Sequence, residues 1–224
     1  MHYSTSERPP GLKHDPFKAI VTPRPIGWVS TVNKDGVPNL APYSYFNAVS
    51  DKPPLVIISS DGRKDSLKNI ELNGEFVCSL ATYGLRDQMN MSSAPVDHGV
   101  SEFKIAGLKT AESKFVKPPR VAESPAALEC KVWKIIELPR SERHPQHGCF
   151  LVIGEVVGVY IDEQFIKDGL FDTKGAQPLA RLGYMDYAVV KEDTVFTLNR
   201  PIVTGSGENV EVTVQSGEWD GVYR

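Results

Sequence analysis

The longest strand-like segment of the chain is CFLVIGEVVGVYI, residues 149–161, and two glycines interrupt it. It exceeds the usual strand length, and a glycine inside a strand marks a bend or a bulge. A long strand that bends at Gly154 and Gly158 suits the corners of a small closed barrel. The preceding segment, residues 127–134, alternates with the period of two that a strand shows. The pattern predicts a β-barrel.

The remaining segments agree with a mainly β fold that carries short peripheral helices. Apolar runs bounded by turn residues predict three further strands, at residues 26–32, 53–60 and 75–81. A short helix is expected over residues 65–73, because Gly74 is a natural residue to follow a helix end. Residues 92–127, rich in proline, glycine, serine and charge, are expected to form a long loop excursion. No segment predicts helices long enough for repeated β-α-β crossovers.

Composition excludes several classes of function. The net charge is −3, so neither a nucleic-acid nor a membrane-surface footprint is expected. The N-terminus lacks the apolar core of a secretory signal, which favours a cytoplasmic protein. The cysteines are odd in number and far apart, which favours buried reduced thiols over disulfides: Cys78, Cys130 and Cys149.

The segment SSDGRKDSLKNI, residues 59–70, places two cations immediately before the expected helix. Asp65 or Ser66 would be its N-cap. Free N–H groups and the positive end of the helix dipole make such a start an anion site, to which Arg63 and Lys64 add charge. The segment is therefore either a phosphate site or a solvated charged turn.

The sequence gives little support to a metal site or to an activated nucleophile. His144, His147 and Cys149 cluster in HPQHGC, but Pro145 breaks any helix that would align the histidines, and no second ligand pair stands elsewhere. A polar hairpin loop is the better interpretation, and no metal is predicted. Without an acid–base pair or an activated nucleophile, chemistry carried by a bound cofactor is favoured.

Three neighbouring stretches share one character: RPIGWVST, NLAPYSYFN and the segment 59–70 each mix apolar residues with hydroxyl, amide or basic groups. Together they would build a groove that is half apolar and half polar, with a phosphate anchor at one end. Flavin mononucleotide (FMN) has that profile, because it joins a flat ring system to a polyol and a terminal phosphate.

These stretches, in this order and spacing, resemble the flavin reductase-like family with the FMN-binding split barrel. The resemblance spans roughly residues 15–200 and includes LARLGYMDYAVV near its end. It implies a Greek-key barrel of six or seven strands, a homodimer, and FMN at or near the subunit interface. Members of the family typically pass a hydride from NADH or NADPH to flavin. Some instead carry electrons or serve as reductase partners of a monooxygenase.

The resemblance also assigns residues to the flavin. At the phosphate end it implies that Arg63, Lys64 and Ser66 hold the phosphate, with Ser59 and Ser60 close to it.

For the rest of the flavin it implies that Ser30 and Thr31 line the ribityl chain or ring edge. Ser44 and Asn47 would bond the polar edge of the ring, and Tyr184 would approach the ring or the interface. Each also has an ordinary interpretation: Ser30 and Thr31 as strand residues, Asn47 as a turn residue and Tyr184 as core.

The sequence thus predicts an FMN-binding, NAD(P)H-dependent flavin reductase-type oxidoreductase that works as a homodimer, with a monooxygenase or another redox protein as a possible acceptor. Two alternatives remain open: a flavin electron-transfer protein without nicotinamide activity, and a ligand-binding barrel without redox chemistry. The split-barrel domain is expected over residues 1–200. Residues 201–224 are expected to form a hairpin-like tail, with PIVT against VEVTV, docked on its own barrel or on a partner subunit.

Overall fold

A computed structural model describes residues 1–140, 145–146, 148–206, 209–215, 217–219 and 221. By internal packing the chain divides into two units, Met1–Val190 and Lys191–Arg224. The division falls ten residues before the boundary that the sequence predicts after residue 200.

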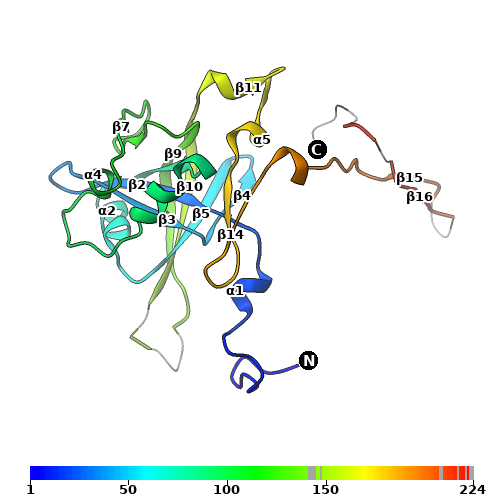
Figure 1. Cartoon of the computed structure of the whole chain (residues 1–224), viewed down its shortest axis with the longest axis horizontal. Coiled ribbons are helices and arrows are strands. Elements are labelled where there is room, and N and C mark those ends of the chain that lie inside the picture. The colour runs from blue at the N-terminus through cyan, green and yellow to red at the C-terminus, as the bar shows by residue number, and fades with distance from the viewer. Residues whose placement is uncertain (141–144, 147, 207–208, 216, 220, 222–224) are drawn as a thin grey trace. The chain divides into compact units, whose positions relative to one another are not determined.

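A seven-stranded antiparallel sheet forms the centre of the first unit (Figure 1). Its strand order is β3-β2-β6-β9-β10-β5-β4, so that β6 joins the β2–β3 hairpin to the β9–β10 hairpin, and β10 pairs directly with β5 of the β4–β5 hairpin. This arrangement confirms the predicted mainly β fold. The strands are β2 (Gly27–Val32), β3 (Pro38–Tyr43), β4 (Phe46–Asp51), β5 (Pro54–Asp61), β6 (Glu75–Leu80), β9 (Ala126–Glu137) and β10 (Cys149–Ile161).

Strand β10 bends where its glycines predict. Its pairing with β9 shifts register between Ile153 and Gly154 and again between Val156 and Gly158. A Cβ atom at Gly154 would lie 2.6 Å from Cε1 of Phe76, a fully buried ring. The glycine therefore lets the core ring approach the backbone at the bend.

Helix α2 (Asp65–Asn73) lies beside β2 and β3 (Figure 1). It ends at Gly74, whose φ of 69° is the left-handed conformation that glycine adopts easily. Its N-cap is Lys64, and not Asp65 or Ser66 as the sequence suggests. The other helices, several of them 3-10, are α1 (Phe17–Ile20), η1 (Tyr83–Leu85), α3 (Arg86–Met91), α4 (Glu102–Ile105), η2 (Glu163–Phe165), α5 (Thr173–Ala176) and η3 (Glu192–Thr194).

Two apolar clusters hold the first unit together. One fills the barrel around Phe76 and Val152, and the inner face of α2 contributes Leu67 and Ile70 to it. The other surrounds Trp28 and joins the sheet to the helices that follow β6. The indole N–H of Trp28 donates to Ser92 at 2.8 Å, so this buried polar group is satisfied.

Shorter strand pairs complete the described residues. A three-stranded sheet has the order β1-β13-β14, with β1 (Arg24–Pro25), β13 (Leu179–Arg181) and β14 (Tyr187–Val189). The excursion adds β7 (Thr110–Ala111) and β8 (Arg120–Val121), and β11 (Ile166–Lys167) pairs with β12 (Leu170–Phe171).

The second unit holds one strand pair, β15 (Ile202–Thr204) with β16 (Glu211–Thr213). Ile202 lies opposite Thr213 in this pair. Its docking surface stays a prediction.

Among the described helices of the chain, none has the length and apolar character that a membrane crossing requires.

Candidate functional site

A cavity of about 650 Å³ opens between β1, β4, β5 and the start of β10. This is within the usual range for sites that hold small ligands or cofactors. We call it the strand-end cavity. Its lining residues are Lys18, Val21, Pro23, Arg24, Pro25, Ser44, Tyr45, Phe46, Asn47, Ile57, Ser59, Asp61, Leu138, Cys149 and Leu151.

The walls of the strand-end cavity combine apolar surface with a few polar groups. Period-two alternation on β5 directs Ile57, Ser59 and Asp61 to the same face, which is the cavity side. Ser44 enters from the turn between β3 and β4, and Asn47 enters from β4 itself. A flat ring with polar edges fits such a lining, since apolar walls cover its faces and polar groups bond its rim.

Positive charge gathers around Tyr45 in this cavity. The ammonium of Lys18 and the guanidinium of Arg24 each lie 6.0 Å from the centre of its ring. Arg24 is buried, and its guanidinium donates to the carbonyl oxygens of Lys18, Val21 and Leu182. These bonds fix the cation and tie α1 and the β13–β14 turn to the cavity wall.

The cations that precede α2 stand two and three residues after Asp61 of the cavity lining, but neither of them lines the cavity. The guanidinium of Arg63 lies 4.7 Å from the ring centre of Phe150, a core residue on the opposite face of β10 from Cys149 and Leu151, which line the cavity. It also pairs with Glu71. Lys64 is exposed at the N-cap, where the helix dipole attracts anions.

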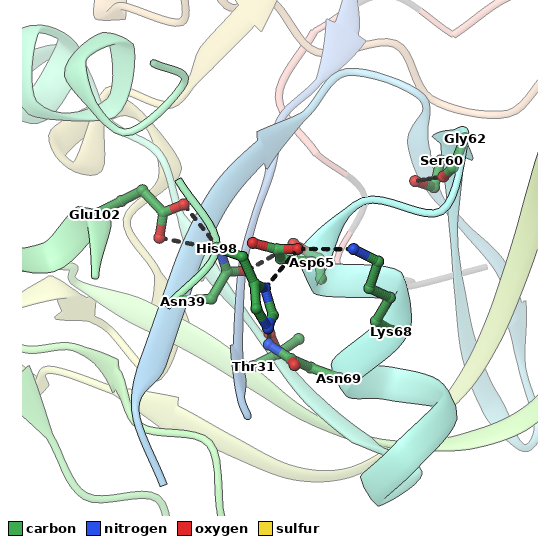
Figure 2. A network of polar contacts seen from close by, with 10 residues as sticks. Thr31, Asn39, Ser60, Gly62, Asp65, Lys68, Asn69, His98 and Glu102 are labelled. Atoms are coloured by element: carbon green, nitrogen blue, oxygen red, sulfur yellow. Dashed lines mark hydrogen bonds and ion pairs between the residues drawn. The ribbon is translucent and has the colours of Figure 1, made fainter. Parts of the chain in front are cut away.

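A buried polar network anchors the start of α2 to the sheet (Figure 2). The hydroxyl of Ser66 donates to Asn39 at 2.8 Å, and that of Thr31 donates to the same amide oxygen at 3.2 Å. The amide of Asn69 donates to Thr31 at 3.0 Å. Asn39 in turn donates to both carboxylate oxygens of Glu102, at 2.8 and 3.0 Å.

Glu102 closes this network from α4. Its carboxylate also accepts the backbone N–H of Leu40 at 2.9 Å. Burial raises the pKa of Glu102, although the bonds from Leu40 and Asn39 act in the opposite direction. The net shift upward is the response expected of a carboxyl group removed from water.

Asp65 occupies the first position of α2 and holds the excursion in place. His98 lies 2.9 Å and Lys68 3.3 Å from the same carboxylate oxygen (Figure 2). Partial burial pushes the pKa of Asp65 up, but the hydrogen bonds and charges of His98 and Lys68 outweigh it, so that the pKa lies below its ordinary value. An ionised Asp65 at the helix N-terminus is also favoured by the dipole.

Tyr43 connects the same region to the strand end. Burial raises the pKa of its phenol, while hydrogen bonds with Ser66 and Ser60 lower it. Ser60 also donates to the carbonyl oxygen of Gly62 at 2.8 Å (Figure 2). Both serine hydroxyls therefore have partners inside the protein.

The site residues predicted from the sequence fall into three groups. Three of them line the strand-end cavity: Ser44, Asn47 and Ser59. Two are exposed cations that do not line it: Arg63 and Lys64. Four have buried side chains with internal hydrogen-bond partners: Ser30, Thr31, Ser60 and Ser66.

Tyr184 stands apart from these groups. Its side chain is 54% exposed, it does not line the strand-end cavity, and its ring lies 5.9 Å from that of His14. Contacts of Tyr184 and of the four buried residues with a flavin stay predictions.

Other cavity residues carry no role in the sequence interpretation, notably Arg24, Tyr45, Phe46 and Cys149. Arg24 is the first residue of the RPIGWVST stretch, and Tyr45 and Phe46 lie within NLAPYSYFN. The sequence therefore predicts that these segments belong to the site, but it assigns no role to these three residues. The sequence interpretation treats Cys149 as a buried thiol or as a candidate metal ligand, whereas in the structure it is only half-buried. Its place on the cavity wall follows from its pairing with Asp61 of β5, a long-range contact without a local sequence signal.

The histidines of HPQHGC, His144 and His147, lie outside the described residues. In the part of the chain that the structure describes, no three His, Cys, Asp or Glu side chains gather as a metal site would require.

A split barrel with a half-polar cavity at its strand ends defines a class of small-ligand-binding barrel proteins. Comparison with known families makes this specific. The model described as "Flavin reductase like domain" matches residues 20–180. The chain therefore belongs to the flavin reductase-like family.

Individual relatives agree with this assignment. An uncharacterized protein of Aquifex aeolicus is 35% identical over 170 residues, which cover 73% of this chain and 83% of the relative. Nitrilotriacetate monooxygenase component B from Bacillus cereus has a similar structure, with a TM-score of 0.79, 31% identity, and coverage of 88% of this chain and 98% of its own. The 2-nitrobenzoate 2-nitroreductase of Pseudomonas fluorescens also has a TM-score of 0.79, with 30% identity and coverage of 92% and 100%.

Proposed function

We propose that the protein is an FMN-binding oxidoreductase that transfers a hydride from NADH or NADPH to flavin. The observation that carries the proposal is the strand-end cavity, which combines apolar walls with polar groups. Two cations before α2 stand two and three residues after Asp61 of its lining. Family membership supports the same chemistry. FMN matches the lining, since its ring needs apolar faces with polar edges and its phosphate needs positive charge.

In this proposal the chain's own residues bind and orient the cofactor. Ser44, Asn47 and Ser59 would bond the polar parts of FMN, and Lys64 and Arg63 would hold its phosphate. Lys18 and Arg24 supply positive charge to the cavity, which favours a ring that becomes negative on reduction. When bound, the flavin supplies the hydride-accepting chemistry, and no protein acid or base is obligatory.

The proposal extends to partners. Similarity to a monooxygenase component suggests that a monooxygenase or another redox protein takes up the electrons. We also propose a homodimer, in line with the assembly that the sequence resemblance implies.

The phosphate assignment is tested by comparing FMN with riboflavin, which lacks the phosphate. A charge-assisted hydrogen bond contributes about 1.5–3 kcal/mol, and each 1.4 kcal/mol is about tenfold in affinity. The double variant Arg63→Ala/Lys64→Ala should therefore weaken FMN by about two orders of magnitude and riboflavin hardly at all. Fluorescence titration of both flavins into full-length protein measures the two dissociation constants.

A matched control removes two exposed cations elsewhere on the barrel, Lys131 and Lys134 of β9. Their double alanine variant should leave both affinities unchanged. If the Arg63/Lys64 variant loses affinity equally for FMN and riboflavin, or loses none for either, the segment is only a charged turn and does not bind the phosphate.

A further inference from the structure

A second cavity lies between the segment that follows β6 and the β13–β14 hairpin, with a volume of about 370 Å³. We call it the hairpin cavity. It shares no lining residue with the strand-end cavity. The two are nonetheless neighbours, because Arg24 of the first is paired in the sheet with Arg181 of the second.

The floor of the hairpin cavity is apolar. Met89 and Leu179 are almost fully buried there, and Val189 packs against the same core cluster. Met185 also lines the cavity and is 79% exposed, so a ligand that covers it removes apolar surface from water, which favours binding by roughly 25 cal/mol per Å². The body of a suitable ligand is therefore apolar.

Two arginine–tyrosine pairs stand at the walls. The guanidinium of Arg86 lies 4.5 Å from the ring centre of Tyr83, and that of Arg181 lies 4.5 Å from the ring centre of Tyr187. All four residues line the cavity. Flat faces of this kind stack well on a flat aromatic ligand.

Hydrogen bonds within the protein hold both guanidinium groups in position. Arg86 donates to the carbonyl oxygen of Tyr83 at 3.0 Å, and Arg181 donates to the carbonyl oxygen of Tyr184 and to the hydroxyl of Tyr187. A guanidinium carries five N–H donors, more than these contacts use. The remaining donors can form the two parallel bonds that a carboxylate accepts.

The local charge fits a monoanion. Asp87 also lines the cavity and lies 3.5 Å from Arg86, so two cations and one anion leave a net charge of +1. The volume is near the lower end of the usual range for ligand pockets, which suits one or two fused rings and not a dinucleotide.

We propose that the hairpin cavity binds a flat aromatic carboxylate, with its ring on the apolar floor and its carboxylate on Arg86 and Arg181. The proposal concerns a site separate from the flavin, and it does not depend on the function proposed above.

The test uses two probes of nearly the same shape, 2-naphthoate and 2-naphthamide, in calorimetric titrations of the full-length protein. The acid should bind at least about tenfold more tightly than the amide, because only the acid carries a negative charge and offers a guanidinium two equivalent oxygens. Arg86→Gln should weaken the acid by about tenfold and leave the amide unchanged. Arg181→Gln should do the same, and its melting temperature shows whether the β13–β14 hairpin has kept its fold.

Arg120→Gln is the matched control, because Arg120 is likewise stacked on a tyrosine ring, that of Tyr160, but lies outside the cavity. It should leave the affinity of the acid unchanged. The proposal is overturned if acid and amide bind equally, or if Arg86→Gln has no effect on the acid. It is also overturned if saturating FMN displaces 2-naphthoate, because the cavity would then belong to the flavin.

Discussion

The three cysteines differ sharply in what can reach their sulfur atoms. Cys78 and Cys130 are buried in the barrel core. The hydrogen bond with Cys130, together with burial, raises the pKa of the Cys78 thiol well above its ordinary value. Cys149 is only half-buried and lines the strand-end cavity, with its sulfur 3.9 Å from a carboxylate oxygen of Asp61.

A thiol reagent should therefore modify Cys149 first and leave Cys78 and Cys130 unmodified while the protein stays folded, because reaction needs an accessible thiolate. Saturating FMN should slow the modification of Cys149 at least about tenfold by covering the cavity wall. Mass spectrometry of peptides after timed labelling measures both effects. Modification of Cys149 at the same rate with and without FMN would place the flavin elsewhere.

Asp65 couples stability to pH, because its pKa in the folded protein is lowered by His98 and Lys68 against the effect of burial. A carboxyl whose folded pKa is depressed stabilises the protein above its unfolded pKa, which is about 3.9 for aspartate. That stability is lost as the pH falls through the folded pKa. Glu102, whose pKa burial raises, contributes with the opposite sign: its stabilisation is present at low pH and lost as the pH rises through its folded pKa.

Comparison of Asp65→Asn with the parent protein isolates the contribution of Asp65 to the free energy of unfolding. Above about pH 4 the variant should be less stable by a few tenths to 1 kcal/mol, as for a partly exposed ion pair. Below the folded pKa of Asp65 the difference should vanish. Urea unfolding at a series of pH values gives both curves, and a constant difference across the acid range would contradict the assignment.

At the scale of elements, helix α2 shows how far local sequence can go. Residues 65–73 and the stop at Gly74 are confirmed, because an amphipathic turn and a terminal glycine are local signals. The hydrogen-bond partner of Ser66 cannot be read from its local sequence, because its hydroxyl donates to Asn39, which lies 27 residues earlier in the chain. Sequence shows that a hydroxyl stands near a cationic turn, but only tertiary packing decides whether it faces a ligand or the core.

In strand β10, too, the local sequence predicts the bends but not the residue against which the strand packs. Gly154 and Gly158 predict the bends, and the register shifts confirm them. The partner that makes Gly154 necessary, the ring of Phe76, lies in another strand and has no signal near the glycine.

Gly154→Ala should destabilise the protein by about 1–3 kcal/mol, because its Cβ would overlap the Phe76 ring and force the core to shift. Gly84→Ala is the control, since nothing lies within 4 Å of the Cβ it would add; it should change the free energy of unfolding by less than about 0.5 kcal/mol. Denaturant unfolding measures both. If the two variants are equally stable, the bend at Gly154 does not depend on close packing.

At the scale of the whole molecule, the fold can be predicted from the sequence more completely than the residues of the proposed site. The barrel follows from strand alternation, glycine bends and the absence of long helices, so it can be predicted from sequence patterns. The strand-end cavity combines α1, β1, β4, β5 and β10, and its lining is decided by strand order. For this reason the segments of the site can be predicted, whereas most of its individual side chains cannot.

The central claim is that the bound flavin receives a hydride from a nicotinamide cofactor. The most direct measurement mixes the FMN-loaded protein with NADH, and separately with NADPH, without oxygen, and follows the yellow absorbance of oxidised flavin in a stopped-flow instrument. We expect at least one of the two to bleach the flavin, in proportion to the nicotinamide consumed. A flavin that binds but stays oxidised with both would contradict hydride transfer, and a protein that retains no FMN would contradict the site itself.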